Sequence, residues 1–556
     1  MEACGRRQGG VGGLMRSGCY LRAVEEADKE LLFEWTNDEE TRRQSFSQEP
    51  VTWEEHTAWF ARTRDNEACR HFILMVSGNG HESAGQECAA GVLRLVRDGV
   101  RGGNSGAYRI SYSIAPAHRG HGYGTVILEL AKAWMIAECP DCMEIYGEVK
   151  AGNAASIRCF ERAGYERAAD GMPFGTEDGG MPFFCFHVDL TSERILYFRA
   201  DGGEKTGIGH LMRCFTIADA CREKGMQAVF VAAEAEAGVM ACKRGYPCRV
   251  LNTDHRNMDA ELPRLMPVLR DCAPIVLDSY FLTEQYVNAL RENGHPVVWM
   301  DDLAEQGFAV DIRINYNLYA EKTGHIPHIR QSDDSRDIRH HDKAGGCIHL
   351  YGPSYAPVRR SFWKKETPVR EQLMTVLVMT GGSDPLGAAM FFSRLLIKLL
   401  PDAELLVVLG PYAERKEELR AYAKQEKKIE VIEGCSDLSD VMRRCDLAVT
   451  AAGSTIYELC ASGLPTIVYY MADNQRMGAE AFARRTGAVN LGDFRSDSFQ
   501  TEAPKKLEAA LLRYIAASER RNLSRRMNVL VDGKGAERIA EKIRELAHAP
   551  SLYSDV

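Results

Sequence analysis

The sequence predicts an α/β protein made of an α+β domain followed by two Rossmann-like α/β lobes. At 556 residues the chain is too long for one hydrophobic core, so roughly three to four domains of about 150 residues are expected. From residue 193 onward, short apolar strands alternate with helices, the pattern of a parallel sheet. The alternation restarts near residue 372 after a charged segment, which indicates a second lobe.

The composition is that of a soluble enzyme. The net charge is −9, from 69 basic and 78 acidic residues, which argues against a dedicated nucleic-acid binder. No apolar run approaches the ~20 residues that span a bilayer, and residues 1–17 lack the apolar core of a secretory signal. The 17 cysteines show no paired metal-ligand spacing. We therefore expect a cytoplasmic protein without a metal, a membrane or a nucleic-acid partner.

The domain boundaries follow from these changes of pattern. We expect a flexible tail over residues 1–18, an α+β domain over 19–191, and two lobes over 192–366 and 367–548. The segment 331–344 is highly charged and has no apolar period, so it is interpreted as an exposed insertion in the first lobe.

The α+β domain is predicted from strands and helices in a fixed order. A glycine-rich segment at 99–106 suits a hairpin loop. The expected strands are 20–23, 71–77, 89–96, 108–114 and 144–149, and the expected helices are 29–37, 53–64, 126–138 and one ending at Arg162.

A glycine loop joins the strand 108–114 to the helix 126–138. Its glycines leave backbone amides bare at a helix N-terminus, where the helix dipole favours an anionic group such as a pyrophosphate. A strand–loop–helix without a ligand would show the same order of elements. The loop residues that we single out are Arg119, Gly120, Gly122 and Gly124.

Two ordered motifs in this domain resemble the GNAT family of acetyl-CoA-dependent N-acetyltransferases. The first is Arg119-x-x-Gly122-x-Gly124, and the second contains Asn153, Ser156, Phe160, Gly164 and Tyr165. The resemblance covers about residues 19 to 190 and implies acetyl-CoA as cosubstrate. It implies that the loop residues Arg119, Gly120, Gly122 and Gly124 hold the pyrophosphate and that Asn153 contacts the pantetheine arm.

One position departs from the family pattern. Many members carry a tyrosine that protonates the departing thiolate where this chain has Phe160, and a phenyl ring has no proton to donate. The general acid stays open among solvent, another group and none; Tyr112, Tyr146 and Tyr165 are nearby in sequence. Glu148 at a strand end is a candidate base, or alternatively a solvated charge.

The first α/β lobe begins with the strand 195–199 and a second glycine loop. Gly202, Gly203, Gly207 and Gly209 reduce side-chain bulk before a helix over 211–224, and His210 stands at its start. An imidazole there can reach a ligand held by the loop, although a turn whose histidine merely caps a helix would look alike. Further strands are predicted at 228–232, 248–251, 274–277 and 297–300, with helices at 235–244, 259–272 and 283–293.

Polar side chains follow the predicted strands of this lobe. Asp278, Tyr280, Asp301 and Asp302 come at strand carboxyl ends, where ligands of parallel sheets bind. Some of these residues are equally well explained as helix caps or turn residues.

The second α/β lobe contains two more glycine turns. The strand 374–379 ends in Gly381-Gly-Ser383, and the strand 447–450 leads into Gly453-Ser454-Thr455 at a helix start, which suits a diphosphate. Glu458 lies one turn into that helix, where its carboxylate can accept the hydroxyls of a ribose. Strands are also predicted at 404–409, 429–432 and 465–469.

Two successive α/β lobes with glycine turns resemble the GT-B glycosyltransferases. Five motifs follow in order within residues 194 to 545: Arg199-Ala-Asp201 with Gly207-Ile-Gly-His-Leu-Met-Arg213, Asp278-Ser-Tyr280, Leu350-Tyr-Gly-Pro-Ser-Tyr-Ala-Pro-Val-Arg359, Gly381-Gly-Ser-Asp384 and Ala452-Gly-Ser-Thr-Ile-Tyr-Glu458. Together they resemble one branch, the nucleotide-sugar hydrolase of pseudaminic acid biosynthesis. The resemblance implies inverting release of UDP without a metal, with His210 activating water and Asp201 and Tyr280 positioning sugar or water. The residues implied to bind UDP are Gly381, Ser383, Gly453, Ser454, Thr455 and Glu458, and those implied to bind the sugar are Arg213, Asn474 and Gln475.

The order of the two parts predicts a bifunctional enzyme. In that pathway, acetyl-CoA first acetylates the 4-amino group of a UDP-linked sugar. The next step hydrolyses the product, UDP-2,4-diacetamido-2,4,6-trideoxy-β-L-altropyranose, to the free sugar and UDP. Two alternatives remain open at this point. One is a GT-B glycosyltransferase that passes the sugar to an acceptor, and the other is a UDP-sugar-binding protein with a degenerate GNAT domain, which Phe160 would explain.

Overall fold

The computed structural model describes residues 15–16, 19–64, 66, 68–77, 87–98, 106–139, 141–168, 182–190, 194–203, 207–303, 307–320, 346–362, 369–382, 384–410, 413–435 and 438–547. The predicted insertion at 331–344, residues 1–14 of the predicted tail and Ser383 lie outside this set. The chain forms two compact units. The first contains residues 1–201, 225–275 and 280–295, and the second contains 202–224, 276–279 and 296–556. The predicted boundaries at 191 and 366 stay predictions.

The first unit contains an eight-stranded sheet with the order β1-β2-β3-β4-β5-β6-β8-β7. All neighbours are antiparallel except β5 and β6, which pair in parallel only from Gly106 to Arg109 of β5. Beyond Arg109 no further pairing of β5 with β6 occurs among the described residues, so the two strands separate toward Ile114. The strands are β1 Met15–Arg16, β2 Cys19–Ala23, β3 Cys69–Ser77, β4 Glu87–Asp98, β5 Gly106–Ile114, β6 Cys142–Lys150, β7 Glu166–Arg167 and β8 Phe183–Asp189.

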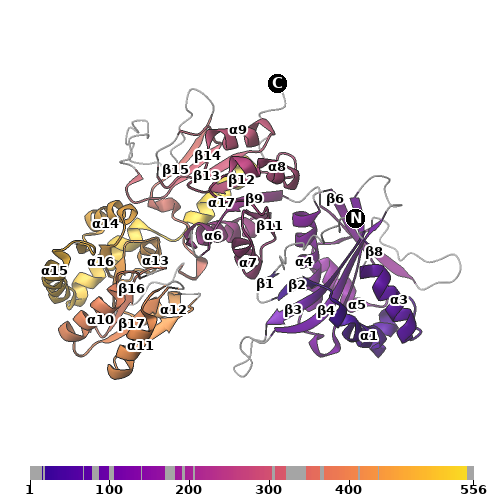
Figure 1. The fold of residues 1–556 in the computed structure, drawn as a ribbon, viewed down its shortest axis with the longest axis horizontal. Helices are drawn as coiled ribbons and strands as arrows, with labels where there is room; N and C mark the ends of the chain where they lie inside the picture. Colours follow the sequence, from indigo (N-terminus) through magenta and orange to yellow (C-terminus); the bar gives the residue numbers. More distant parts are fainter. Residues whose placement is uncertain are drawn as a thin grey trace, which may run out of the picture. The chain divides into compact units, whose positions relative to one another are not determined.

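Helices flank this sheet close to their predicted positions (Figure 1). The helix α4 buries an apolar face that includes Ile127, Leu128 and Leu130, and this burial stabilises it against the sheet. The helices are α1 Lys29–Asn37, α2 Glu39–Gln44, α3 Trp53–Arg64, α4 Tyr123–Glu138 and α5 Ala154–Arg162, with 3-10 turns at Glu26–Asp28 and Pro116–His118.

The first unit continues into parallel strands in the order β11-β10-β9. The single helix predicted over 259–272 is wrong. The segment forms two 3-10 turns, Asp259–Glu261 and Met266–Val268, around the short helix α8 Leu262–Leu265, because Pro263 and Pro267 lack the N–H groups that a continuous helix needs. The other elements are β9 Arg194–Ala200, β10 Met226–Ala232, α7 Ala235–Lys243, β11 Cys248–Val250 and α9 Glu284–Glu292.

The second unit contains a six-stranded parallel sheet with the order β18-β17-β16-β19-β20-β21. The chain moves outward from β16 in one direction and from β19 in the other, so the topological switch point lies between these two strands. Their carboxyl ends carry the predicted Gly381 and Gly453 turns. The strands are β16 Thr375–Met379, β17 Glu404–Leu409, β18 Ile429–Glu433, β19 Leu447–Ala451, β20 Thr466–Tyr470 and β21 Asn490–Asp493.

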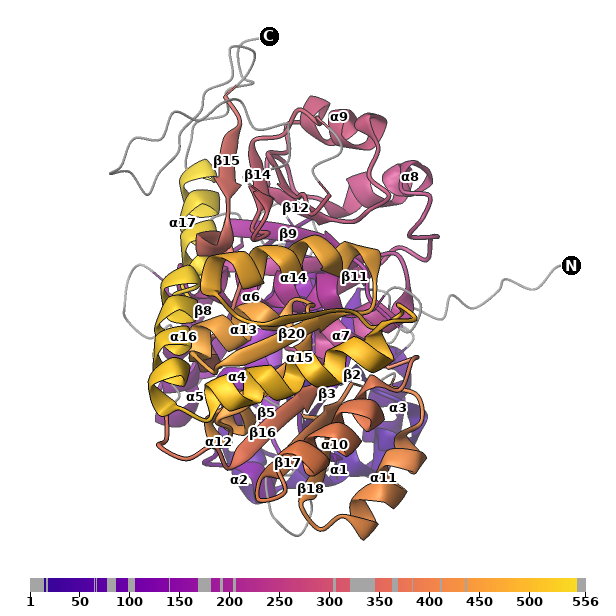
Figure 2. The same cartoon turned by 90° about the vertical axis from the view of Figure 1, so that its left-hand side faces the viewer.

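Helices cover this sheet, with α10 against β16 and β17 and α14 against β20 (Figures 1 and 2). No helix among the described residues is long and apolar enough to cross a membrane. The helices are α10 Ala388–Leu399, α11 Lys416–Gln425, α12 Ser439–Arg444, α13 Thr455–Ser462, α14 Asp473–Thr486, α15 Phe499–Tyr514, α16 Ala517–Leu530 and α17 Gly535–Leu546.

The second unit also holds the helix whose first turn contains His210. This helix, α6 Gly209–Glu223, packs against α17, and Lys224 Nζ lies 2.8 Å from Glu541 Oε2. The parallel strands β13 Val297–Met300, β14 Ile312–Asn315 and β15 Ile348–Tyr351 lie in the same unit. The strand β14 is not among the predicted strands, because its buried Arg313 interrupts a short apolar run. The strand β12 Ile275–Asp278 ends in the carboxylate that faces His210.

Candidate functional sites

The glycine loop before α4 adopts the backbone that the sequence predicts. Gly120 and Gly122 have φ angles of +80° and +81°, in the left-handed region that favours glycine. The amide groups of residues 120–124 make no backbone hydrogen bond within the described part of the chain. They precede or begin α4, so they are available to an anion at its positive end.

Arg119 anchors this loop to the preceding helices. Its Nε donates to the carbonyl oxygen of Ile114 at 3.2 Å, and its terminal nitrogen donates to Asp38 and to Thr41 Oγ1. Hydrogen bonding to Arg119 holds the pKa of the Asp38 carboxyl below its ordinary value. A direct contact between Arg119 and acetyl-CoA stays a prediction.

Gly124 allows α5 to approach the start of α4, and Asn153 caps α5. A Cβ atom on Gly124 would lie 2.7 Å from Cys159 Sγ, so only glycine permits this approach. Asn153 Oδ1 accepts a hydrogen bond from the Ser156 amide at 3.0 Å and thereby caps α5. The structure thus gives Asn153 a structural role, and its contact with pantetheine stays a prediction.

The hydroxyl groups of the three tyrosines considered as general acids have different hydrogen-bond partners. Tyr165 donates to the carbonyl oxygen of Leu128, and Tyr146 donates to Asp98. Tyr112 instead lies beside the first turn of α5, with its hydroxyl 3.1 Å from Ser156 Oγ.

Phe160 and Glu148 occupy different environments in the same domain. The Phe160 ring is 2% exposed and packs on Tyr165 and Phe186, as a core residue does. Glu148 is exposed on β6, and its Oε2 lies 3.8 Å from an Arg109 terminal nitrogen. This position is compatible with a base and equally with a solvated ion pair.

In the second unit, His210 and Asp278 form a close pair. His210 Nδ1 lies 2.6 Å from Asp278 Oδ1, and the aspartate side chain is fully buried. Burial alone would raise the pKa of Asp278, but Arg213 and His210 hold it well below the ordinary value. The ionised carboxylate can accept a hydrogen bond from Nδ1–H of His210, and in that tautomer the lone pair lies on Nε2.

Arg213 makes the pair part of a larger cluster. Its guanidinium donates from Nε and one terminal nitrogen to Asp278, and from the other terminal nitrogen to Asp302 at 2.5 Å and Tyr316 at 3.0 Å. The side chain is only 10% exposed. The structure thus commits Arg213 to this cluster, and a contact with sugar stays a prediction. We name His210, Arg213, Asp278, Asp302 and Tyr316 the His210 cluster.

Asp201 and Tyr280 are described in the first unit, whereas His210 belongs to the second. Asp201 accepts hydrogen bonds from buried Arg199 and from the Ala233 amide, so both carboxylate oxygens have protein partners. Arg199 also binds Glu261, whose side chain is 0% exposed. Tyr280 is 51% exposed. Their predicted action beside His210 stays a prediction.

The turns predicted to hold UDP lie at the switch point of the second sheet. Gly381 has a φ angle of +87°, and Gly453, Ser454 and Thr455 connect β19 to the N-terminus of α13. Glu458 in α13 accepts a hydrogen bond from Arg359 Nε at 2.8 Å. Gln475 Oε1 accepts from the Met471 amide at 3.0 Å, while Asn474 is exposed in the first turn of α14.

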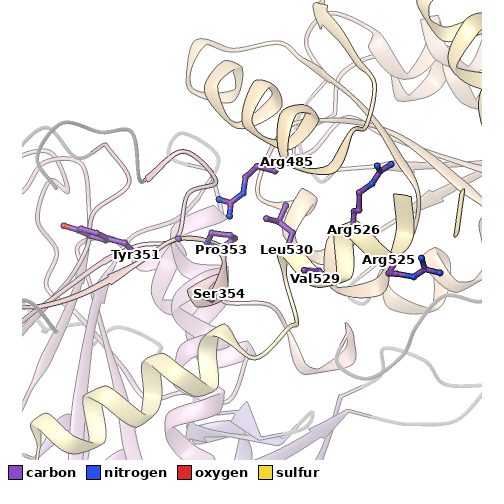
Figure 3. A pocket seen from close by; sticks show the side chains of 9 residues that line it. Tyr351, Pro353, Ser354, Arg485, Arg525, Arg526, Val529 and Leu530 are labelled. Carbon is purple, nitrogen blue, oxygen red and sulfur yellow. The ribbon is translucent and has the colours of Figure 1, made fainter. Parts of the chain in front are cut away.

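A cavity of about 540 Å³ lies elsewhere in the second unit (Figure 3). It is lined by the turn 351–354, by Arg485 and by one side of α16, and Figure 3 shows Arg525 and Arg526 extending away from that turn. Among the described residues, none of the predicted site residues lines it. The cavity therefore does not coincide with the predicted site residues, whose roles stay predictions.

Two family models match separate parts of the chain. Residues 19–166 match the acetyltransferase (GNAT) domain, and residues 375–543 match the glycosyltransferase family 28 C-terminal domain. The chain therefore carries a GNAT acetyltransferase domain near its N-terminus, as its motifs predicted, and a glycosyltransferase family 28 C-terminal domain in the part predicted as the second GT-B lobe.

Two curated relatives have names from polysaccharide and pseudaminic acid biosynthesis. The spore coat polysaccharide biosynthesis protein SpsG of Bacillus subtilis is 24% identical over 368 residues, which cover 62% of this chain and 97% of that protein. The Helicobacter pylori pseudaminic acid cytidylyltransferase and UDP-2,4-diacetamido-2,4,6-trideoxy-β-L-altropyranose hydrolase is 24% identical over 233 residues, 41% of this chain and 38% of that protein.

Two further similarities are to an uncharacterized protein and to a solved acetyltransferase. An uncharacterized protein of Methanocaldococcus jannaschii is 21% identical over 54% of this chain, and the match spans only 60% of that relative. The solved spermidine N-acetyltransferase of Vibrio cholerae, in complex with CoA and spermine, is 17% identical over 32% of this chain and 98% of its own, with a TM-score of 0.27.

Proposed function

We propose that the chain is a bifunctional enzyme of nonulosonate biosynthesis. It acetylates the 4-amino group of a UDP-4-amino-4,6-dideoxy sugar with acetyl-CoA, and then hydrolyses the UDP-2,4-diacetamido-2,4,6-trideoxy-β-L-altropyranose to free sugar and UDP. The observation that carries the hydrolase is the buried His210–Asp278 pair, with 2.6 Å between Nδ1 and Oδ1, in a chain that also has a family 28 C-terminal domain.

The hydrolytic step needs a base, a held diphosphate and a water. In the proposal, His210 Nε2 takes a proton from water while the water oxygen attacks the anomeric carbon opposite UDP. The bond from that carbon to the β-phosphate oxygen breaks with inversion, and UDP leaves as an anion. Amides and hydroxyls at Gly453, Ser454 and Thr455 stabilise that anion, which is usually the dominant electrostatic contribution.

The acetyl-transfer step uses the GNAT domain with acetyl-CoA as cosubstrate. The sugar amine loses a proton, attacks the thioester carbon and displaces the CoA thiolate, which is then protonated. Glu148 is the candidate base. The amides of residues 120–124 at the start of α4 hold the pyrophosphate of acetyl-CoA. CoA bound to the Vibrio cholerae acetyltransferase agrees with this cosubstrate for the family.

The proposal is tested by giving the purified full chain acetyl-CoA and UDP-4-amino-4,6-dideoxy-N-acetyl-β-L-altrosamine. Mass spectrometry should detect free CoA first and free UDP second. Without acetyl-CoA the amino sugar nucleotide should persist, because hydrolysis follows acetylation. Failure to release UDP from the diacetamido sugar nucleotide would contradict the hydrolase, and failure to release CoA would contradict the acetyltransferase.

Two alternatives each have one supporting observation. The family 28 match favours a glycosyltransferase, which would release UDP only when an acceptor is added. The buried phenyl ring at Phe160 favours a UDP-sugar-binding protein whose GNAT domain is degenerate. Such a chain would bind the UDP-sugar but not acetyl-CoA. UDP release without an acceptor, and saturable binding of acetyl-CoA, distinguish the proposed function from both.

A further inference from the structure

Tyr457 lies between the turn 453–455, which is proposed to hold the diphosphate, and the His210 cluster. It belongs to the first turn of α13, two residues after Thr455, and is 8% exposed. Its ring meets the Tyr316 ring edge-on, with 5.2 Å between the ring centroids. A hydrogen bond with the backbone of Leu318 holds the Tyr457 hydroxyl next to the segment that follows β14.

Tyr316 continues the contact toward His210. Its hydroxyl accepts a hydrogen bond from an Arg213 terminal nitrogen at 3.0 Å, and the guanidinium carbon lies 5.8 Å from the centre of its ring. The other terminal nitrogen of Arg213 lies 3.1 Å from His210 Nδ1. An unbroken series of packed side chains therefore joins the N-terminus of α13 to the histidine.

The geometry of Arg213 makes this series stiff. Its guanidinium is planar and is held by Asp278 on one edge and by Asp302 and Tyr316 on another, so it cannot turn without disturbing every partner. The side chains of Asp278 and Arg213 are 0% and 10% exposed, which leaves little room for water to replace a lost contact. A small displacement of Tyr316 would therefore be transmitted to the carboxylate that orients His210.

We propose that Tyr457 and Tyr316 are positioning residues that couple occupancy of the turn 453–455 to the orientation of His210. A diphosphate bound at the N-terminus of α13 fixes this helix, and Tyr457 then holds Tyr316 and Arg213 in the arrangement that aims Nε2 at the attacked carbon. The inference rests on the proposed hydrolase and assigns to it two residues that do not touch the substrate.

The kinetic test compares three variants of the full chain with the UDP-diacetamido sugar. Tyr457→Leu removes the ring contact and should lower kcat about 3- to 30-fold, the range of couplings carried by packed networks, with KM and the Kd for UDP nearly unchanged. Tyr457→Phe keeps the ring and should stay near the wild-type kcat. Tyr514→Leu changes another buried tyrosine of the same lobe, 0% exposed and outside the cluster, and should leave kcat unchanged.

Non-additivity and a direct view of His210 complete the test. Tyr316→Phe should also lower kcat, and adding Tyr457→Leu to it should lower kcat little further, because both variants interrupt one series of contacts. In protein labelled with ¹⁵N-histidine, the His210 signal is assigned by its loss in His210→Asn. UDP should shift this signal in the wild type and shift it less in Tyr457→Leu, although both bind UDP.

The outcomes separate the inference from the proposed function. Wild-type kcat in Tyr457→Leu, a loss equal to that of Tyr514→Leu, or an undiminished UDP-induced shift of the His210 signal would overturn the coupling while leaving the hydrolase intact. A wild-type chain that releases no UDP from the sugar nucleotide would overturn the proposed function itself.

Discussion

The loop before α4 is built from backbone, whereas the His210 cluster is built from side chains. The loop presents amides beside two glycines with φ angles of +80° and +81°. The His210 cluster presents an imidazole held by a buried carboxylate and a nearly buried guanidinium. A backbone site tolerates changes of neighbouring side chains but not an added Cβ. A site of buried charges fails when any one partner is removed, since the others then lose their compensation.

Replacing the imidazole should produce the largest effect and confine it to one side of the comparison. His210→Ala should lower UDP release about 10²- to 10⁴-fold, because a positioned general base is lost. Release of CoA should continue at the wild-type rate. Both products are followed by chromatography. His255→Ala removes a histidine that pairs with Glu234 instead and serves as the control; full-rate UDP release by His210→Ala would refute the assigned base.

Removing a buried charge should affect both activity and stability. Asp278→Asn leaves Arg213 and His210 without their anion, so unfolding should become easier by about 3–5 kcal/mol, and UDP release should fall as well. Denaturant titration measures the stability. The matched variant Asp532→Asn breaks an ion pair with Arg538 whose aspartate is 44% exposed, and it should cost at most about 1 kcal/mol. Equal losses of unfolding free energy from the two variants would show that burial does not make the charges of the His210 cluster costlier to unpair than a surface ion pair.

A single methyl group should disturb the backbone site. Gly122→Ala places a Cβ on a residue with φ of +81°, at a cost of about 1–2 kcal/mol, and should raise the KM for acetyl-CoA without changing UDP release. Gly152→Ala is the matched control, since a Cβ there meets nothing within 4 Å and its φ lies outside the left-handed range. If both variants keep the wild-type KM, the loop does not hold the cosubstrate.

The smallest expected effect is a pH dependence of stability in the acetyltransferase domain. Burial, reinforced by Arg94, lowers the pKa of His71 from 6.5 to about 4, while Asp28 opposes this shift. Below pH 6.5 the unfolded chain therefore binds a proton that the folded chain does not, so stability falls as the pH falls toward 4. Between pH 7 and pH 6 the loss should be about 0.7 kcal/mol.

Thermal unfolding of the wild type and of His71→Phe between pH 7 and pH 5 measures this contribution. The wild type should lose more stability than the variant over this range. Parallel curves for the two proteins would show that His71 does not titrate as its burial demands.

The sequence predicted the two kinds of site unequally. The loop before α4 was found because its glycines and the flanking strand and helix are adjacent in the chain, and local spacing specifies backbone geometry. His210 was found in the same way. The rest of its cluster was only partly found, since Asp278, Asp302 and Tyr316 lie 68, 89 and 103 residues from His210 or Arg213 along the chain. Local periodicity carries no information about such contacts.

Two errors have local physical causes. The predicted helix over 259–272 does not form as one helix, because Pro263 and Pro267 interrupt its hydrogen bonds. The missed β14 contains buried Arg313, which is paired with Asp301 at 2.7 Å and so does not read as a core residue in the sequence. Because β14 was missed, Tyr316 directly after it was not recognised as a neighbour of Arg213.

The first unit does not end where the acetyltransferase sheet ends. Arg270 donates hydrogen bonds to the carbonyl oxygens of Leu190 and Cys142, Arg249 pairs with Glu138, and α4 packs against β10 and β11. A chain cut at residue 191 would expose this seam to water on both fragments. The acetyltransferase domain and the strands that follow it therefore share one packed interface, and we expect the two parts to fold and to be degraded together.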